Sequence, residues 1–280
     1  MKKLLNIFIA VLLVSITSKA QSDSSFKFIR LIQGDMVGFT VDNLDNIYIL
    51  NNHNQIKKLS ANGDSIAIFN NVKKFGQATL VDVSNPLKVL LYYEDFATVV
   101  VLDRFLNIRN TIDLRKQNIF QVKAIGQSYD NKIWLYDELD NKLKKIDEDG
   151  KLLLETTDFR LLLGQAPSPL KIFDQDKYVY LYDSLQGVYV FDYYGALKNN
   201  IMISHWHNFK VAGKYIFGSR SDTLYRYEIN SFRLDEWKMP EQIYRSRSFN
   251  FTSTRLYALK KEGIEIYSLR LLYFQRFQYF

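Results

Sequence analysis

Residues 41–66 read VDNLDNIYILNNHNQIKKLSANGDSI, and residues 129–153 read YDNKIWLYDELDNKLKKIDEDGKLL. In both copies a polar turn leads into an apolar strand, and a second turn leads into a strand with paired lysines. Each copy then reaches a turn in which Gly follows Asn or Asp. Turns of this composition accept the tight dihedral angles that join antiparallel strands. The repeat therefore predicts strands that pair with their neighbours in the sequence.

Six copies of this unit cover the chain. In the first copy, four strand-length segments follow one another: GFTVD, NIYIL, QIKKL and SIAIF. The central residues of the most apolar strands are 42, 44, 46, 37 and 40 residues apart, a spacing typical of a propeller blade. These central residues are Tyr48, Leu90, Trp134, Tyr180, Phe217 and Tyr257. We therefore predict an all-β protein, a six-bladed β-propeller with four-stranded antiparallel blades.

The last unit departs from the pattern, because IEIYSLRLLYFQRF runs on without a Gly or Asn turn. Its fourth strand is therefore not defined by the repeat. The segment FKFIRLI near the N-terminus is a candidate for that strand, since propellers commonly close their ring by sharing strands between the chain ends. The sequence leaves open which terminus supplies the strand, and removal of residues 271–280 is expected to lower the melting temperature sharply.

The first twenty residues have the pattern of an export signal. Lys2 and Lys3 precede the apolar run LLNIFIAVLLVSI, and small residues, Ser18 and Ala20, stand before Gln21. We expect a signal peptide over residues 1–20 and a single propeller domain over residues 21–280, located in the periplasm. A retained membrane anchor is the alternative, although the apolar run is short for a bilayer span.

Charge and cysteine content exclude several classes of function. The net charge of +7 falls to +4 without the three leader lysines, and no block of five like charges occurs, so nucleic acid is not an expected partner. The absence of cysteine excludes disulfides, thiolate metal sites, a cysteine nucleophile and a lipidated cysteine. We therefore expect no direct membrane insertion, and any attachment to a membrane would come through a protein partner.

The chain ends in YFQRFQYF, and many outer-membrane barrels also end in an aromatic residue. Barrel strands are about ten residues long with one lipid-facing apolar row. The strands of this chain are shorter, fall into groups of four and are apolar on both faces, which favours stacked blades.

The repeat unit resembles NHL-type repeats, whose consensus is a Val-Asp turn, Ile-Tyr-Val, a basic strand and Asp-x-x-Gly. The match is closest over residues 41–64 and 129–150. Over its mature length the chain resembles exported six-bladed propellers of Bacteroidota. That resemblance implies an accessory subunit of an envelope assembly, such as a protein secretion translocon. It transfers no active site, because the matching positions are turn and core positions.

The segment SHWHN places His205 and His207 on either side of Trp206. Two histidines two residues apart can hold a metal from one face of a strand, but no further ligand is near in the sequence. A polar loop between blades, with Trp206 packed on the ring, is the simpler interpretation. An exposed Trp would also be a good anchor for a protein partner, so we predict these three residues as partner-binding.

Acidic residues end three of the innermost strands: Asp42, Asp82 and Asp174. Six-bladed hydrolases and lactonases hold a catalytic calcium ion at such a channel mouth. An Asp that caps a tight turn explains each case more simply, and we predict no metal and no cofactor. The other three units end instead in Gln127, Gly213 and Thr252.

Two tyrosine pairs, Tyr92-Tyr93 and Tyr193-Tyr194, could stack on sugars. Because neighbouring residues of a strand face opposite sides, one tyrosine of each pair is expected in the core and the other on the surface. We predict Tyr93 and Tyr194 as further partner-binding residues. The paired lysines of several units are expected to be solvated blade edges.

The sequence contains no nucleophile elbow and no phosphate-binding glycine loop. The prediction is therefore a non-enzymatic protein-binding propeller, an accessory subunit of a periplasmic or outer-membrane assembly. A calcium-dependent hydrolase or lactonase on the same fold, or a carbohydrate-binding propeller, is the alternative.

Overall fold

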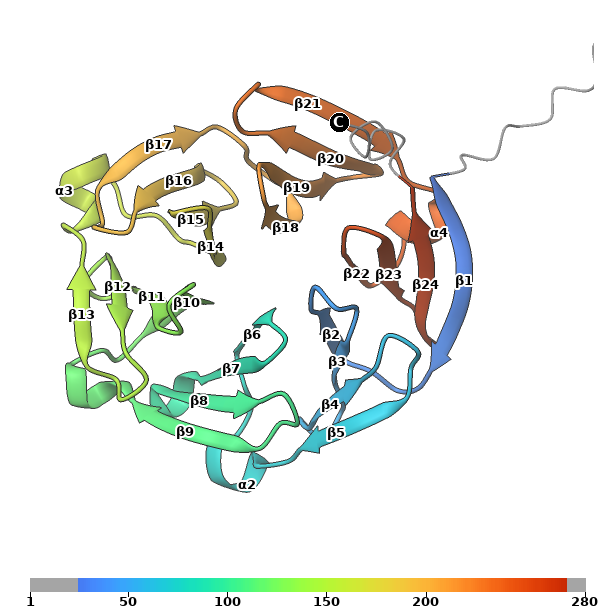
Figure 1. Ribbon diagram of the computed structural model, residues 1–280, viewed down its shortest axis with the longest axis horizontal. Helices are drawn as coiled ribbons and strands as arrows, with labels where there is room; N and C mark the ends of the chain where they lie inside the picture. Colours follow the sequence, from blue (N-terminus) through green and yellow to red (C-terminus); the bar gives the residue numbers. More distant parts are fainter. Residues whose placement is uncertain (1–24, 271–280) are drawn as a thin grey trace, which may run out of the picture.

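The computed structural model describes residues 25–270, which form six four-stranded antiparallel sheets around a central axis (Figure 1). The predicted six-bladed propeller is therefore confirmed. The innermost strands of the six blades surround the centre of the ring. The predicted export signal, residues 1–20, and the C-terminal segment 271–280 lie outside the described residues.

Each of the first five blades is a meander whose four strands follow one another from the axis outward. Blade 1 contains β2 (Gly38–Val41), β3 (Ile47–Leu50), β4 (Ile56–Leu59) and β5 (Ser65–Phe69). Blade 2 contains β6 (Leu80–Asn85), β7 (Lys88–Tyr93), β8 (Thr98–Asp103) and β9 (Ile108–Asp113). Blade 3 contains β10 (Val122–Gln127), β11 (Ile133–Asp137), β12 (Lys142–Ile146) and β13 (Leu152–Glu155). Blade 4 contains β14 (Lys171–Gln175), β15 (Tyr178–Asp183), β16 (Gly187–Asp192) and β17 (Leu197–Ile201). Blade 5 contains β18 (His207–Ala212), β19 (Tyr215–Arg220), β20 (Thr223–Glu228) and β21 (Arg233–Lys238).

Short helical turns occupy the connections. These are α2 (Val72–Phe75), α3 (Phe159–Leu163), α4 (Glu241–Tyr244), η1 (Glu94–Phe96) and η2 (Leu114–Gln117). Among the described residues, no helix combines the length and the apolar character needed to cross a membrane.

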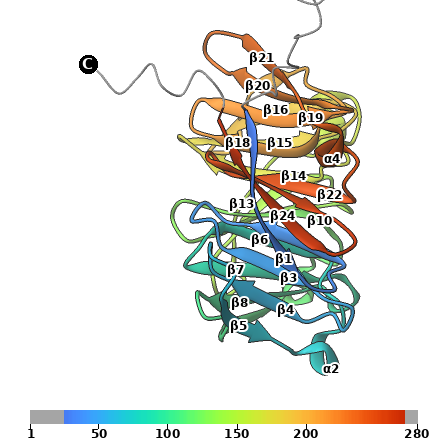
Figure 2. The same ribbon diagram turned by 90° about the vertical axis from the view of Figure 1, so that its right-hand side faces the viewer.

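Blade 6 is built from both ends of the described chain. Its first three strands are β22 (Ser248–Phe251), β23 (Arg255–Leu259) and β24 (Gly263–Leu269), and its outer strand is β1 (Phe26–Gln33). β1 pairs antiparallel with β24, and Figure 2 shows the two strands side by side at the edge of the ring. The N-terminal segment, one of the two candidates from the sequence, thus supplies the closing strand.

The outer strand of blade 6 is also tied to blade 1. The Arg30 guanidinium donates to the carbonyl oxygens of Ala61 at 2.6 Å and of Asn62 at 2.8 Å. Phe26 is buried against Leu269 and Tyr267 of the same blade. β1 therefore closes the sheet and also joins the last blade to the first.

The core lies between blades, because the second and third strands of each blade are covered on both faces. All six residues of β7 are buried, and the apolar cluster between blades 3 and 4 joins Trp134 and Tyr136 to Val179 and Leu181. This two-sided burial accounts for the near-continuous apolar character of the second strand in every unit. The predicted alignment of those six strands is confirmed.

The paired lysines are only partly the solvated edges that the sequence predicted. Lys58, Lys144 and Lys145 are buried in third strands. The Lys58 ammonium donates to the carbonyl oxygen of Arg104 in blade 2 at 2.9 Å, and burial lowers the pKa of Lys58. The partner of Lys58 thus comes from a turn outside its own repeat unit, whereas Lys144 pairs with Asp137 and Asp140 and Lys145 pairs with Asp130, all in their own blade. The exposed lysines of the couplets are Lys73, Lys74 and Lys261.

The connectivity gives the ring two different faces. Because each blade is a meander, the turns between strands one and two and between strands three and four lie on one face, here called the hairpin face. The turns between strands two and three, and the links between blades, lie on the opposite connector face. This division decides which loops can meet at each mouth of the central channel.

Candidate functional site

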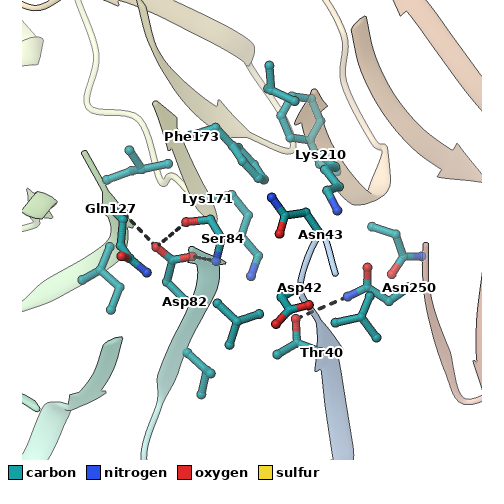
Figure 3. A pocket seen from close by; sticks show the side chains of 18 of the residues that line it. Thr40, Asp42, Asn43, Asp82, Ser84, Gln127, Lys171, Phe173, Lys210 and Asn250 are labelled. Atoms are coloured by element: carbon teal, nitrogen blue, oxygen red, sulfur yellow. Dashed lines mark hydrogen bonds between the residues drawn. The ribbon is translucent and has the colours of Figure 1, made fainter. Parts of the chain in front are cut away.

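A central cavity of about 800 Å³ runs between the innermost strands of all six blades. Figure 3 shows polar side chains from several blades that point into it, among them Asp42, Asp82, Lys171 and Lys210. A second, largely apolar cavity of about 410 Å³ is lined by residues of blades 5 and 6 and by Asn43. Lys210 and Asn43 border both cavities.

Asp42 follows β2 and is completely buried. One carboxylate oxygen accepts the backbone N–H groups of Leu44 and Asn46, both at 2.9 Å. The other accepts from the Asn46 amide at 2.8 Å and from the Tyr48 hydroxyl at 3.1 Å. All these donors lie within six residues, so the carboxylate closes its own turn, as the simpler sequence interpretation proposed.

Asp82, in β6, links blade 2 to blade 3. It accepts from the backbone and hydroxyl of Ser84 and, at 2.7 Å, from the backbone N–H of Gln127 in β10. The Gln127 amide returns a hydrogen bond to the carbonyl oxygen of Lys88 at 2.7 Å. Burial raises the pKa of the Asp82 carboxyl, although its hydrogen bonds act in the opposite direction.

Asp174, in β14 of blade 4, accepts four hydrogen bonds, as Asp42 does, but from residues of two blades. It accepts from the Ser128 hydroxyl at 2.7 Å, the Trp134 indole N–H at 3.0 Å and the Tyr193 hydroxyl at 2.6 Å. The backbone N–H of Tyr129 lies at 3.4 Å. Three of the four donors belong to blade 3, so this carboxylate joins two blades and is more than a turn cap.

These hydrogen bonds decide how well the acidic residues suit a calcium ion. Calcium requires six to eight oxygen ligands, whereas the carboxylate oxygens of Asp42, Asp82 and Asp174 already accept bonds from protein donors. Within residues 25–270, no group of three or more His, Cys, Asp or Glu side chains is placed to hold a metal ion. The donor set therefore does not fit the calcium centre of a hydrolase.

The SHWHN segment is arranged differently from the exposed anchor that the sequence suggested for Trp206. The Trp206 ring is 7% exposed and stacks on Tyr225 at 5.1 Å. Its backbone N–H donates to the Tyr182 hydroxyl, which in turn donates to the Trp206 carbonyl oxygen. The ring is buried because Gly218 leaves room for it: a Cβ at position 218 would lie 2.5 Å from the ring.

The two histidines of this segment are exposed on either side of the buried ring. His205 precedes the strand and has a left-handed backbone, with φ of 59°, whereas His207 begins β18 and borders the central cavity. They therefore do not form a pair on one strand face. Their placement does not test partner binding, which stays a prediction for both.

The tyrosine pairs differ from each other. Tyr93 is 3% exposed, packs against Phe75 and has its pKa raised to about 12 by burial. The expected alternation fails there because blade 2 is covered on both faces, so Tyr93 does not offer its ring to a partner. Tyr194, in contrast, is 89% exposed and Tyr193 is half-buried, but both lie in the turn between β16 and β17, so alternation along a strand does not explain the difference.

Sequence reasoning missed a third tyrosine, Tyr129, which is 68% exposed. Its ring stacks on Tyr193 with centroids 4.6 Å apart and planes 14° from parallel. The Lys145 ammonium lies 5.5 Å and 5.6 Å from these two ring centroids and pairs with Asp130 at 2.9 Å. We call Tyr129, Tyr193 and Tyr194 the tyrosine platform. In the sequence, the sign of this platform is Tyr129, which begins the second quoted repeat at the position where the first repeat has Val41.

No protein-family model matches the chain, and no curated protein sequence matches it. Solved structures match over most of its length. A streptogramin B lyase shares 12% identity at a TM-score of 0.55, covering 88% of this chain and 97% of that one. A catalytically inactive virginiamycin B lyase from Staphylococcus aureus, solved with quinupristin, shares 13% at 0.57, covering 88% and 98%. The Pan2 WD40 domain of Neurospora crassa shares 10% at 0.59, covering 85% and 90%. At these identities the similarity establishes the propeller fold and no activity.

Proposed function

We propose that this chain is a non-enzymatic protein-binding propeller that holds its partner on the hairpin face, at the tyrosine platform. The partner is a protein of the cell envelope, and the chain is an accessory subunit of a periplasmic or outer-membrane assembly such as a secretion translocon. Export rests on the leader pattern around Lys2 and Lys3. The similarity to NHL-type repeats and to exported propellers of Bacteroidota supports the same role.

One observation carries the proposal: the stacked rings of Tyr129 and Tyr193 are held in place, and Tyr129 and the nearby Tyr194 are exposed. Tyrosine is enriched at the centres of protein interfaces because its ring is large and amphipathic. The Asp174 carboxylate fixes the Tyr193 hydroxyl, and Lys145 lies near both stacked rings. Rings that are already ordered lose less conformational entropy when a partner binds.

The position of the platform also suits a protein partner. Tyr129 belongs to the turn between the first two strands of blade 3, and Tyr194 to the turn between the last two strands of blade 4. Both turns lie on the hairpin face by the connectivity of the blades. Further exposed apolar side chains occupy turns of the same face, namely Leu44, Leu87, Phe105 and Phe232. A broad partner could contact these turns around the platform.

The test is affinity isolation of the tagged protein from detergent-solubilised envelopes. Tyr129→Ala combined with Tyr194→Ala is expected to reduce capture of a stoichiometric partner by roughly tenfold or more, the effect of losing interface hot spots. Tyr244→Ala is the matched control, because Tyr244 is 37% exposed in α4, between blades 5 and 6 on the connector face. The control is expected to capture as much partner as the unchanged protein.

Equal capture by the platform variant and the control would contradict the proposal. Retention of envelope glycans in place of a protein would replace it with a carbohydrate-binding role. The envelope location has its own test, since the mature protein isolated from the native envelope is expected to begin at Gln21 by intact mass. Retention of Met1 would contradict export.

A further inference from the structure

Two lysines on neighbouring blades extend into the central cavity. Lys171 begins β14 in blade 4, and Lys210 lies in β18 of blade 5. Both line the cavity, and Figure 3 shows their side chains pointing into the opening, together with the amide of Asn43. The innermost strands thus carry cationic groups in addition to the acidic ones that the sequence predicted.

Neither lysine forms an ion pair with a carboxylate within residues 25–270. The Lys210 ammonium has only a long hydrogen bond, 3.4 Å, to the carbonyl oxygen of Phe251. Burial lowers the pKa of Lys210, while the charges of Asp42 and Asp45 act in the opposite direction. An ammonium that is partly removed from water without a close counter-ion is a cost to the empty protein.

The carboxylates near these lysines act on them at a longer range than an ion pair, Asp42 and Asp45 on Lys210 and Asp82 on Lys171. Asp42 and Asp174 each accept four hydrogen bonds, and Asp82 accepts three, from protein donors. Burial raises the pKa of Asp82, while its hydrogen bonds and the Lys171 charge act in the opposite direction. The acceptor sites of these carboxylates are therefore occupied by protein donors, and the charged groups left to bind a ligand directly are the lysine ammonium groups.

The remaining lining sets the chemical class of the ligand. Asn43 is exposed at the cavity, and its amide has no hydrogen-bond partner among the described residues, so it is available as donor and acceptor. Phe39 and Phe173 supply half-buried aromatic walls. A cavity of about 800 Å³ is of the size that holds a small organic molecule.

We infer that the central cavity binds a small organic carboxylate. Its carboxylate group pairs with the ammonium groups of Lys171 and Lys210, and its body lies against Phe173 and Phe39. Inorganic phosphate shares the negative charge but would leave the aromatic walls without a partner. The inference goes beyond protein binding at the tyrosine platform, and its test involves no protein partner.

The experiment is calorimetric titration of the full-length mature protein with succinate, citrate and phenylacetate. At least one of these is expected to bind saturably with one-to-one stoichiometry, and the uncharged succinamide is expected not to bind. Lys171→Gln and Lys210→Gln are each expected to weaken binding by roughly tenfold or more. Lys261→Gln, which removes one exposed charge from a connector turn of blade 6, is the matched control and is expected to bind as the unchanged protein does.

Lys171 is exposed, so its substitution is expected to leave the fold intact, which circular dichroism would check. Absence of saturable binding for all three carboxylates at millimolar concentration would overturn the inference. Binding that survives both lysine substitutions would overturn it as well. Binding of inorganic phosphate alone, titrated in parallel, would replace the organic carboxylate with an inorganic anion.

Discussion

The junction between blades 3 and 4 and the junction between blades 5 and 6 are each crossed by a charged side chain from an innermost strand. At the first, Asp174 accepts three close hydrogen bonds and one longer one. At the second, Lys210 donates one long hydrogen bond to Phe251 and borders an apolar cavity. The innermost strands of one repeat architecture thus carry one charge that is fully partnered and one that is not.

This difference indicates that the Asp174 junction stabilises the ring, whereas the Lys210 junction is suited to binding a ligand. A buried charge with several donors stabilises the native state, because its removal leaves those donors unsatisfied. A desolvated charge without a close counter-ion destabilises the empty protein and is relieved by a ligand. The two junctions therefore predict stability changes of opposite sign when their charges are removed.

Removal of the closing strand, at the junction between blade 6 and blade 1, is expected to cause the largest loss of stability. A protein that begins at Gly34 lacks β1, and so loses the burial of Phe26, the pairing with β24 and the Arg30 contacts to blade 1. We expect the free energy of unfolding to fall by on the order of 4 kcal/mol, from lost burial and lost hydrogen bonds.

Chemical denaturation would measure this loss, with a protein that begins at Ser25 as the control that keeps β1. Equal stability of the two truncations would show that another segment closes blade 6.

Asp174→Ala tests the fully partnered junction. The substitution leaves the Trp134 indole N–H and the Ser128 hydroxyl without their acceptor in a buried setting. Unfolding free energy is expected to fall by about 3 kcal/mol. Asp149→Ala is the control, because Asp149 is exposed in a turn and its carboxylate has no hydrogen-bond partner among the described residues. A loss no greater than that of the control would mean that the junction is held by its apolar contacts alone.

Gly218→Ala tests the junction between blades 4 and 5. This junction holds the buried Trp206 ring in place of a buried charge. The new Cβ would lie 2.5 Å from Cε3 and 2.9 Å from Cβ of Trp206, so the ring must move away from Tyr225. Such overpacking costs about 2 kcal/mol. The checks are the melting temperature and tryptophan fluorescence, against Gly38→Ala, whose Cβ would meet no atom within 4 Å. Unchanged fluorescence and stability would show that Trp206 is loosely packed.

The sequence predicted the fold well because its signals are local. Strand, turn and strand follow one another within each unit, and the predicted second strands match β3, β7, β11, β15, β19 and β23. The role of Asp42 was predictable for the same reason, since its donors lie within six residues. The closing strand was recognised as a candidate, but only the pairing of β1 with β24 decided between the chain ends.

The site was less predictable, because its contacts join residues about one repeat apart. Asp174 accepts from Ser128, 46 residues earlier, and Lys58 donates to Arg104, 46 residues later. No pattern within one unit encodes such a contact. The same reason explains Trp206, whose burial depends on the absence of a side chain at Gly218 in the next strand.

Lys210→Met has the smallest expected effect, and its sign is opposite to that of Asp174→Ala. The substitution keeps an apolar chain of similar length between the two cavities and removes a charge whose pKa burial lowers. The long hydrogen bond to the carbonyl oxygen of Phe251 is lost, but the desolvation cost is lost too. At neutral pH the ligand-free variant is expected to be more stable than the unchanged protein by on the order of 1 kcal/mol.

The pH dependence of this gain follows from the direction of the pKa shift. Because the folded protein holds the Lys210 proton less tightly than the unfolded chain, the cost of the charge is fully present below the folded pKa. It disappears as the pH rises toward the ordinary value of 10.5. The stability difference between Lys210→Met and the unchanged protein is therefore expected to shrink as the pH is raised above neutrality, as denaturant titrations across that range would show. The charges of Asp42 and Asp45 reduce the shift. A variant that is less stable than the unchanged protein at neutral pH would instead make Lys210 a structural tie to blade 6, and the contrast between the two junctions would then be one of degree only.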